Sequence, residues 1–288
     1  MEGSSLPCFV EAMRELGYVD GKSVSFEFRF AKDDYKKLPA FAAELVRLRP
    51  DVILTAGPGA TSAANATTTI PIIVGPGGEE TLTRLAGNLA HPTGNVTGFT
   101  LLSVEQEQKC LEFLKELAPR TSRVALLLNP DNPSDRDYPG ILAPAAVKLS
   151  LTLIRIEARN VSDLSEAFGA STAAGANAIY IVDDPALAGT GPVRKQVSEW
   201  ALRRGLPVVS PNARVASDGG LLSFGTDLNV LNRRAASYVD KVLKGVKPAD
   251  LPVERPSVFN LTVNVKTARV LGLTIPQALL LRADELIQ

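Results

Sequence analysis

The sequence is poor in the residues that build metal, disulfide and catalytic sites. Of its 288 residues only two are cysteine and one is histidine. Cys8 and Cys110 have neither a CxxC spacing nor nearby histidine partners, so a metal site or a disulfide framework is not expected. His91 precedes a proline in the polar loop "LAHPTGN", which favours a surface position over a general base. We therefore predict no metal, no cofactor and no catalytic residues, and hence no enzyme.

The sequence also lacks an excess of charge and any long apolar run. Thirty-one basic and thirty-one acidic residues cancel, so overall charge gives no reason to expect nucleic acid as a partner. No window of about 18 apolar residues occurs. The start "MEGSSLPC" lacks the basic and apolar regions of a secretory signal, and predicts a cytoplasmic protein if this start is genuine; a signal already removed would leave the same sequence.

What the chain does contain is an alternation of short apolar runs and helical segments, typical of an α/β protein with parallel sheets. A first set has expected strands at 23–30, 51–57 and 70–78, with an amphipathic helix over 34–50. A second set starts with a helix over 103–119, for which Ser103 is a candidate N-cap. Its expected strands are 123–129, 151–158, 177–184 and 206–212. A helix over 230–246 and an extended segment before a short helix complete the chain.

A glycine-rich stretch, "AGPGATSAANATTTIPIIVGPGGEE" (56–80), places two turns after two apolar runs. It is not a dinucleotide fingerprint, because Ser62 stands where a third glycine is needed and Pro58 separates the first two. Backbone N–H groups at a helix start beside hydroxyls suit a carboxylate or another small anion. The alternative is an ordinary strand-to-helix turn. The candidate ligand-binding residues here are Gly57, Gly59, Thr61, Ser62, Gly75 and Gly77.

Short polar residues follow the expected strands of the second set. Asp183 and Asp184 end an apolar run, and one of them is expected to face a site, because adjacent residues of an extended chain point to opposite sides. Such a carboxylate suits a ligand ammonium or a metal; the alternative for the other is helix capping. Asn129, Asp131 and Asn212 also lie at strand ends, where they bond either a ligand or their own turn, and turn formation is the prediction for any single one. Trp200 and Tyr180 are predicted to pack in the core.

A resemblance covers the chain from about residue 9 onward. It is carried in order by "ELGYVDG", "HPTGNVTGFTLL", "RVALLLNPDNP", "GGLLSFGTDL", "KGVKPADLPVE" and "LGLTIP". The sequence resembles the ABC-transporter substrate-binding proteins that include the tryptophan- and tyrosine-binding lipoproteins. The resemblance implies a type I periplasmic-binding-protein fold with two Rossmann-like lobes and three crossovers. The N-terminal lobe would be 1–98 with 226–256, and the C-terminal lobe 99–225 with 257–288.

The resemblance also implies a function. The chain would be the solute-binding component of an ABC importer, binding an amino acid or aromatic acid in an interlobe cleft that closes by a hinge motion, and delivering it to a membrane permease. Its location would be periplasmic or extracytoplasmic. The positions that match the family's cleft loops are 57–62, 75–78, 129–132, Asp183, Asp184 and Asn212, with Phe224 beside a crossover. A cytosolic ligand-sensing module, a degenerate non-binding relative and, further behind, an α/β enzyme remain as alternatives.

Two departures from the family pattern accompany this resemblance. Family members usually have an apolar strand and a cleft loop before the helix that matches "FVEAMRELGY", so the first strand of the N-terminal lobe is expected to be missing or displaced. Relatives also often carry "VGDP" where this chain has "VGPGGEE". The second departure removes an aspartate from one of the expected ligand loops.

Overall fold

The computed structural model describes residues 6–31, 34–101 and 104–288. The chain divides into two compact units. The first unit comprises Met1–Leu102 and Asp227–Ser257, and the second comprises Ser103–Thr226 and Val258–Gln288. Each unit is an α/β structure with its own sheet and its own buried core. The expected N-cap Ser103 lies outside the described residues.

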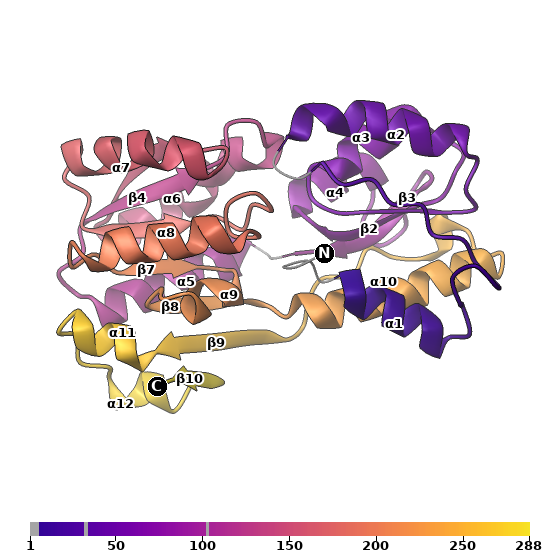
Figure 1. Cartoon of the computed structure of the whole chain (residues 1–288). Coiled ribbons are helices and arrows are strands. Elements are labelled where there is room, and N and C mark those ends of the chain that lie inside the picture. Colours follow the sequence, from indigo (N-terminus) through magenta and orange to yellow (C-terminus); the bar gives the residue numbers. More distant parts are fainter. Residues whose placement is uncertain (1–5, 32–33, 102–103) are drawn as a thin grey trace. The chain divides into compact units, whose positions relative to one another are not determined.

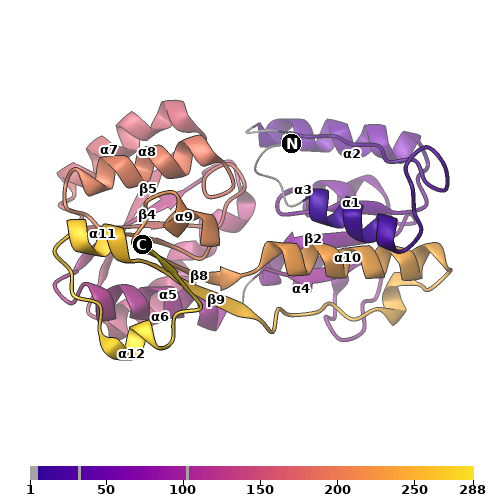
Figure 2. The same cartoon turned by 60° about the horizontal axis from the view of Figure 1, so that its bottom comes forward.

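The sheet of the first unit is entirely parallel in the described part of the chain, with the order β1-β2-β3. Its strands are β1 (Ile53–Thr55), β2 (Ile72–Gly77) and β3 (Val96–Thr100). Its helices are α1 (Leu6–Glu15), α2 (Leu38–Arg47), α3 (Gly59–Ala66), α4 (Glu79–Ala86) and α10 (Leu228–Leu243), with short 3-10 helices at Tyr35–Lys37 and Pro248–Asp250. α1 lies beside α10 (Figures 1 and 2).

The core of the first unit has two sides because successive side chains of a strand point to opposite faces. Ile73 packs in the cluster that joins α1 and α10, where Phe99 and Tyr238 meet with ring centroids 4.6 Å apart. Ile72 and Val74 pack in the other cluster, together with buried residues of α3 and α4. The apolar run that predicted this strand is therefore buried on both faces, as expected for a parallel sheet.

The predicted strand over 23–30 is wrong. Apart from an isolated bridge between Asp20 and Val24, the described residues give this segment no strand partner. The alternating pattern still places every second side chain on the same side: Phe26, Phe28 and Phe30 stack with successive ring centroids 5.9 Å apart. A period of two specifies which side chains share a face, but a strand also needs a neighbour for its backbone N–H and C=O groups.

The sheet of the second unit has the order β10-β9-β8-β7-β6-β4-β5. Neighbouring strands are parallel except for the antiparallel pair β8 and β9. Its strands are β4 (Arg123–Leu128), β5 (Thr152–Glu157), β6 (Ala178–Ile181), β7 (Val208–Ser210), β8 (Leu222–Thr226), β9 (Phe259–Asn264) and β10 (Glu285–Ile287). The four strands predicted in this unit are thus present, within one to three residues at their ends.

Helices cover both faces of this second sheet. Figure 2 shows α7 (Leu164–Ala173) and α8 (Gly191–Leu202) on one face, and α5 (Val104–Leu117) and α6 (Tyr138–Lys148) on the other. The remaining helices are α9 (Ala213–Ser217), α11 (Val265–Val270) and α12 (Gln277–Leu280), with 3-10 helices at Pro133–Asp137 and Val161–Asp163. None of the helices in the described ranges is long and apolar enough to span a membrane.

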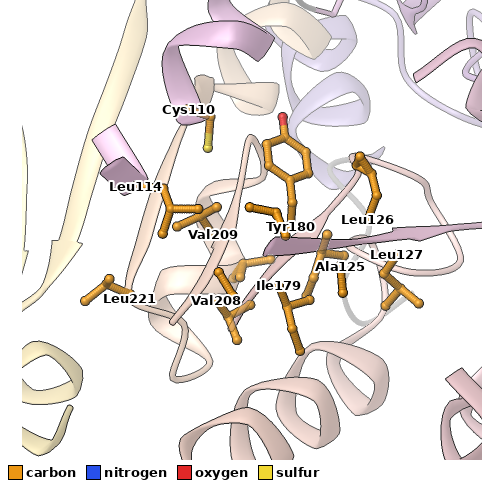
Figure 3. Close-up of a cluster of buried hydrophobic side chains, with 14 of the residues drawn as sticks. Cys110, Leu114, Ala125, Leu126, Leu127, Ile179, Tyr180, Val208, Val209 and Leu221 are labelled. Atoms are coloured by element: carbon orange, nitrogen blue, oxygen red, sulfur yellow. The ribbon is translucent and has the colours of Figure 1, made fainter. Parts of the chain in front are cut away.

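The strands at the centre of the second unit show the alternation directly. In Figure 3, Tyr180 and Val209 point to the side of the sheet that carries Cys110 and Leu114 of α5, whereas Ile179 and Val208 point to the opposite side. All of these side chains are almost completely buried. This arrangement brings the Tyr180 hydroxyl under α5, where it can meet a polar group of that helix.

Gly98 in β3 provides a test of the first sheet. Its φ is +147°, and a Cβ added there would lie 2.0 Å from the Val74 carbonyl oxygen, beside the register irregularity between Val74 and Pro76. We expect Gly98→Ala to destabilise the first unit by roughly 2 kcal/mol or more, measured by urea unfolding. Gly94→Ala is the control, because a Cβ at Gly94 meets nothing within 4 Å. Equal stability of the two variants would contradict the assigned backbone conformation.

Candidate functional site

Polar side chains of the second unit gather where its parallel strands end. Asn129 follows β4, Asp183 and Asp184 follow β6, and Asn212 follows β7. The Asn129 side chain donates to Asp184 Oδ1 at 3.3 Å, and the Asn212 side chain donates to Asp183 Oδ1 at 2.8 Å. The structure thus brings together four of the residues that the sequence singled out, at the edge of an α/β sheet where ligands usually bind.

Asp184 is completely buried and supports the local backbone. Its Oδ1 accepts hydrogen bonds from the backbone N–H groups of Ala186 and Leu187 at 2.8 and 3.0 Å. Its Oδ2 accepts one from the Asn132 side chain at 2.8 Å, in addition to the Asn129 contact on Oδ1. These donors account for the burial of a carboxylate. Asp184 therefore stabilises the turn over 185–188; this turn is not a helix, so the helix capping predicted as the alternative to ligand contact is not seen here.

Asn132 joins Asp184 to another buried acid that the sequence did not reveal, Asp135. The Asn132 amide also donates to Asp135 Oδ1 at 2.8 Å, and the Asn129 backbone N–H donates to Asp135 Oδ2 at 2.9 Å. Burial raises the pKa of Asp135, and the nearby Asp184 raises it further. The bond from Asn129 shows that "LNPDNPSD" forms a compact turn that closes on its own aspartate.

Asp183 keeps contact with solvent, since this residue is only partly buried. Loss of surrounding water raises its pKa to about 6, and Asp184 adds to this, while the bond from Asn212 and the charges of Arg214 and Arg194 act in the opposite direction. Asn212 is itself held in place because its Oδ1 accepts the Arg214 backbone N–H and caps α9. Asp183 is accordingly a fixed, partly accessible carboxylate.

Glu107 of α5 lies behind this edge and was missed by the sequence reasoning. Its carboxylate accepts the Tyr138 hydroxyl at 2.6 Å and the Tyr180 hydroxyl at 2.5 Å. Burial raises its pKa to about 7, against the opposing effect of the two phenols, and Asp183 contributes a smaller increase. The signal was present, because Glu107 stands on the same helical face as the buried Cys110, Leu111 and Leu114.

Two predicted residues of this unit have other surroundings. Asp131 pairs with Arg159 at 3.5 Å, and its backbone N–H donates to Asn129 Oδ1. Phe224 lies on β8 and makes an edge contact with Phe113, with ring centroids 5.0 Å apart. Trp200 and Tyr180 are buried as predicted, although the Tyr180 hydroxyl also takes part in the polar network around Glu107.

In the first unit the two glycine-rich turns lie next to each other. The Gly57 N–H donates to the Pro76 carbonyl oxygen at 2.9 Å, so the end of β1 is bonded to the end of β2. Small residues are required at this contact: a Cβ on Gly59 would lie 2.4 Å from Thr55 Oγ1, and a Cβ on Gly77 would lie 2.9 Å from Val74. The two loops predicted separately therefore form one surface of the first unit.

The start of α3 offers fewer backbone donors than the sequence predicted. The N–H groups of Gly59 and Ala60 donate to the carbonyl oxygens of Ala56 and Gly57, both at 3.2 Å, because the chain turns tightly after β1. These two amides are thus already used. Thr61 Oγ1 instead accepts a hydrogen bond from the Arg84 guanidinium of α4 at 3.2 Å. The polar groups of this edge are therefore the hydroxyls of Thr61 and Ser62 together with an exposed cation, Arg84.

The described residues contain no group of three or more His, Cys, Asp or Glu side chains that could hold a metal ion. His91 is exposed, as predicted. What the two edges provide is a set of fixed hydrogen-bonding groups of opposite charge. Arg84 and two hydroxyls stand in one unit, and Asp183 stands in the other.

Two α/β units with polar groups at the carboxyl ends of parallel strands are the architecture of type I periplasmic binding proteins. The chain belongs to the family of ABC transporter substrate-binding proteins, whose family model matches residues 5–287.

The relatives of known structure or binding property agree with this assignment. A tyrosine-binding protein of Clostridioides difficile is 26% identical over 267 residues, which are 92% of this chain and 75% of that protein. A conserved domain protein of Vibrio cholerae superposes with a TM-score of 0.89 at 26% identity, covering 98% of this chain and 94% of the other. An ABC domain of Streptococcus pneumoniae in complex with L-Trp gives 0.88 at 26% identity, covering 98% and 95%.

Asn132 should be important for stability because it donates to two buried carboxylates. We expect Asn132→Ala to lower the free energy of unfolding of the second unit by roughly 2–4 kcal/mol, since both acids lose a donor. Asn160→Ala is a matched control. Asn132 and Asn160 each cap a 3-10 helix, because the Oδ1 atom of each accepts the backbone N–H two residues further on, at Ser134 and Ser162. Asn160 lies outside the buried cluster. Urea unfolding compares the two, and equal losses would contradict the special role of Asn132.

Glu107 should make stability depend on pH. Because its pKa rises from 4.5 to about 7 on folding, the folded protein retains a proton that the unfolded chain loses. Its contribution is fully present below pH 4.5 and is lost as pH rises toward 7, by up to about 3 kcal/mol. We expect Glu107→Gln to gain stability relative to the wild type across this window, measured by urea unfolding at several pH values.

The control for this experiment is Glu112→Gln on the same helix. The pKa of Glu112 is lowered, mainly by its bond from Lys109, so this variant should lose stability relative to the wild type as pH rises toward 4.5, and the difference should stay constant between pH 4.5 and 7. A difference between Glu107→Gln and wild type that does not change with pH would refute the assignment.

Proposed function

We propose that this protein is the solute-binding component of an ABC importer and that its ligand is an amino acid, with L-tryptophan and L-tyrosine as the first candidates. The observation that carries the proposal is Asp183, a carboxylate fixed by Asn212 at the carboxyl end of a parallel strand and still partly exposed. Such a group pairs with an ammonium. The relatives that bind tyrosine and L-Trp support the same ligand class.

The ligand carboxylate has a matching partner in the first unit. Arg84, together with the hydroxyls of Thr61 and Ser62, forms a basic and hydrogen-bonding edge beside the β1 and β2 turns. Arg84 supplies the charge that the backbone of α3 was expected to provide. In this proposal Arg84, Thr61 and Ser62 bind the ligand carboxylate, and Asp183 binds its ammonium; the interlobe cleft implied by the family resemblance stays a prediction.

The proposal includes an extracytoplasmic location and delivery of the unmodified ligand to a membrane permease, as family membership suggests. Isothermal titration with the common L-amino acids and with aromatic acids that lack an amino group tests the ligand class. We expect binding of L-tryptophan or L-tyrosine and weak or no binding of the acids without an ammonium. Absence of binding by every amino acid would refute the proposed function.

Asp183→Asn tests the ammonium partner. The amide keeps the shape of the side chain but not its charge, so we expect affinity for the bound amino acid to fall at least about tenfold at pH 7.5. In the wild type, affinity should fall by about tenfold per pH unit below about pH 6, because the ammonium requires ionised Asp183. The variant should show a flatter profile over this range.

The matched control is Asp131→Asn, since Asp131 is another strand-end aspartate of the second unit but already pairs with Arg159. It should bind the amino acid as the wild type does. If Asp183→Asn and Asp131→Asn behave alike, Asp183 is not the ammonium partner.

A further inference from the structure

The end of β2 and the start of α4 are bonded to two places where the chain leaves the first unit; we define residues 75–78 as the β2 terminus. The Leu101 backbone N–H donates to the Gly77 carbonyl oxygen at 2.8 Å. On the other side, the Arg255 guanidinium makes a two-point contact with Glu79, the residue that follows this segment and starts α4, at 3.1 and 2.5 Å. The first unit ends at residue 102 on one connection and at residue 257 on the other.

The second of these connections is held firmly up to Arg255. The Glu254 N–H donates to the Gly98 carbonyl oxygen and its own carbonyl accepts the Thr100 N–H, both at 2.9 Å, so this residue runs alongside β3. The Glu254 side chain receives two bonds from Arg234, at 2.9 and 2.8 Å, and one from the Tyr238 hydroxyl at 2.8 Å. The backbone that carries Arg255 is therefore a fixed reference point.

The contact between Glu79 and Arg255 adds little to stability. The Arg255 side chain is 61% exposed and the Glu79 side chain 27% exposed, and ion pairs at the surface contribute little to the free energy of unfolding. Its two-point geometry does fix the direction of the contact, because the two N–H groups of a guanidinium donate to both oxygens of a carboxylate in one plane. The effect of this contact is therefore on the position of the β2 terminus and not on the stability of the protein.

We propose that Glu79 and Arg255 are a positioning pair that couples the β2 terminus to the connection at residues 251–257. Ligand contact at Gly75 and Gly77 and the position of the backbone at residues 251–257 then depend on each other. This inference rests on the proposed function and on the prediction that Gly75 and Gly77 contact the ligand. Neither residue contacts the ligand. Loss of either residue breaks the contact between Arg255 and Glu79, while the bond from Leu101 to Gly77 remains.

A double-mutant cycle tests the coupling. We expect Glu79→Gln and Arg255→Gln each to weaken binding of L-tryptophan or L-tyrosine by about threefold to tenfold, and the double variant to be no weaker than either single one. The melting temperature should stay within about 2 °C of the wild type. Arg282→Gln, which breaks the exposed pair with Glu116 in the second unit, is the control and should change neither quantity.

Hydrogen exchange of the ligand-free protein gives an independent measurement. Arg255→Gln should speed exchange at the Leu101 amide and at residues 75–79, and Arg282→Gln should not. If the wild type binds no amino acid, the proposed function fails while this measurement still decides the coupling. Unchanged affinity in the single variants of a protein that binds, or unchanged exchange in Arg255→Gln, overturns the inference.

Discussion

The burial of the Asp184 carboxylate is the constraint around which the binding edge of the second unit is organised. A buried charge without partners costs several kcal/mol, so the chain must bring donors to it. Those donors come from the turn after β4 and from the segment after β6 itself. Each fixes the piece of backbone that carries it, and the turn that carries Asn129 and Asn132 also encloses Asp135. The direction in which the adjacent Asp183 points follows from this arrangement.

The same constraint divides the acids of this edge into two kinds. Asp184 has protein donors on both oxygens, whereas Asp183 keeps part of its surface and has a raised pKa. Glu107 and Asp135 have raised pKa values as well, chiefly because they are buried. Asp183 and Glu107, with pKa values of about 6 and about 7, can change their charge at small cost when a cation arrives, because the cation favours the ionised form. The acids of this edge are therefore not all charged at neutral pH.

The sequence predicted the parts of the structure that depend on local pattern. Apolar runs located β4 to β7, and helical spacing located α2, α5 and α10. Burial of a strand, or of one face of a helix, requires apolar residues at regular positions, and these can be recognised in the sequence. The segment 23–30 failed, since the pattern does not say whether a neighbouring strand exists. The candidate site was predicted in part: the meeting of Asn129, Asp183, Asp184 and Asn212 follows from parallel strands. The role of Arg84 depends on a contact between α3 and α4, which no local pattern records. Asp135 lies in the same turn as Asn129 and Asn132, but the turn residues alone do not say which acid becomes buried.

The two units position their polar groups by different physical means, and under the proposed function this difference gives them different parts in ligand selection. In the first unit the turns are fixed by close packing, where a Cβ at Gly59, Gly77 or Gly98 would overlap a neighbour. Such a surface is defined by shape, and in the proposed function Arg84 and the hydroxyls beside it donate to the ligand carboxylate whatever the rest of the ligand is. In the second unit Asp183 is placed by hydrogen bonds and neighbouring charges, so it responds to the charge of what approaches. For the ligand proposed above, rejection of acids without an ammonium therefore comes from the second unit, because a carboxylate left unpaired on binding is more costly than a missing apolar contact.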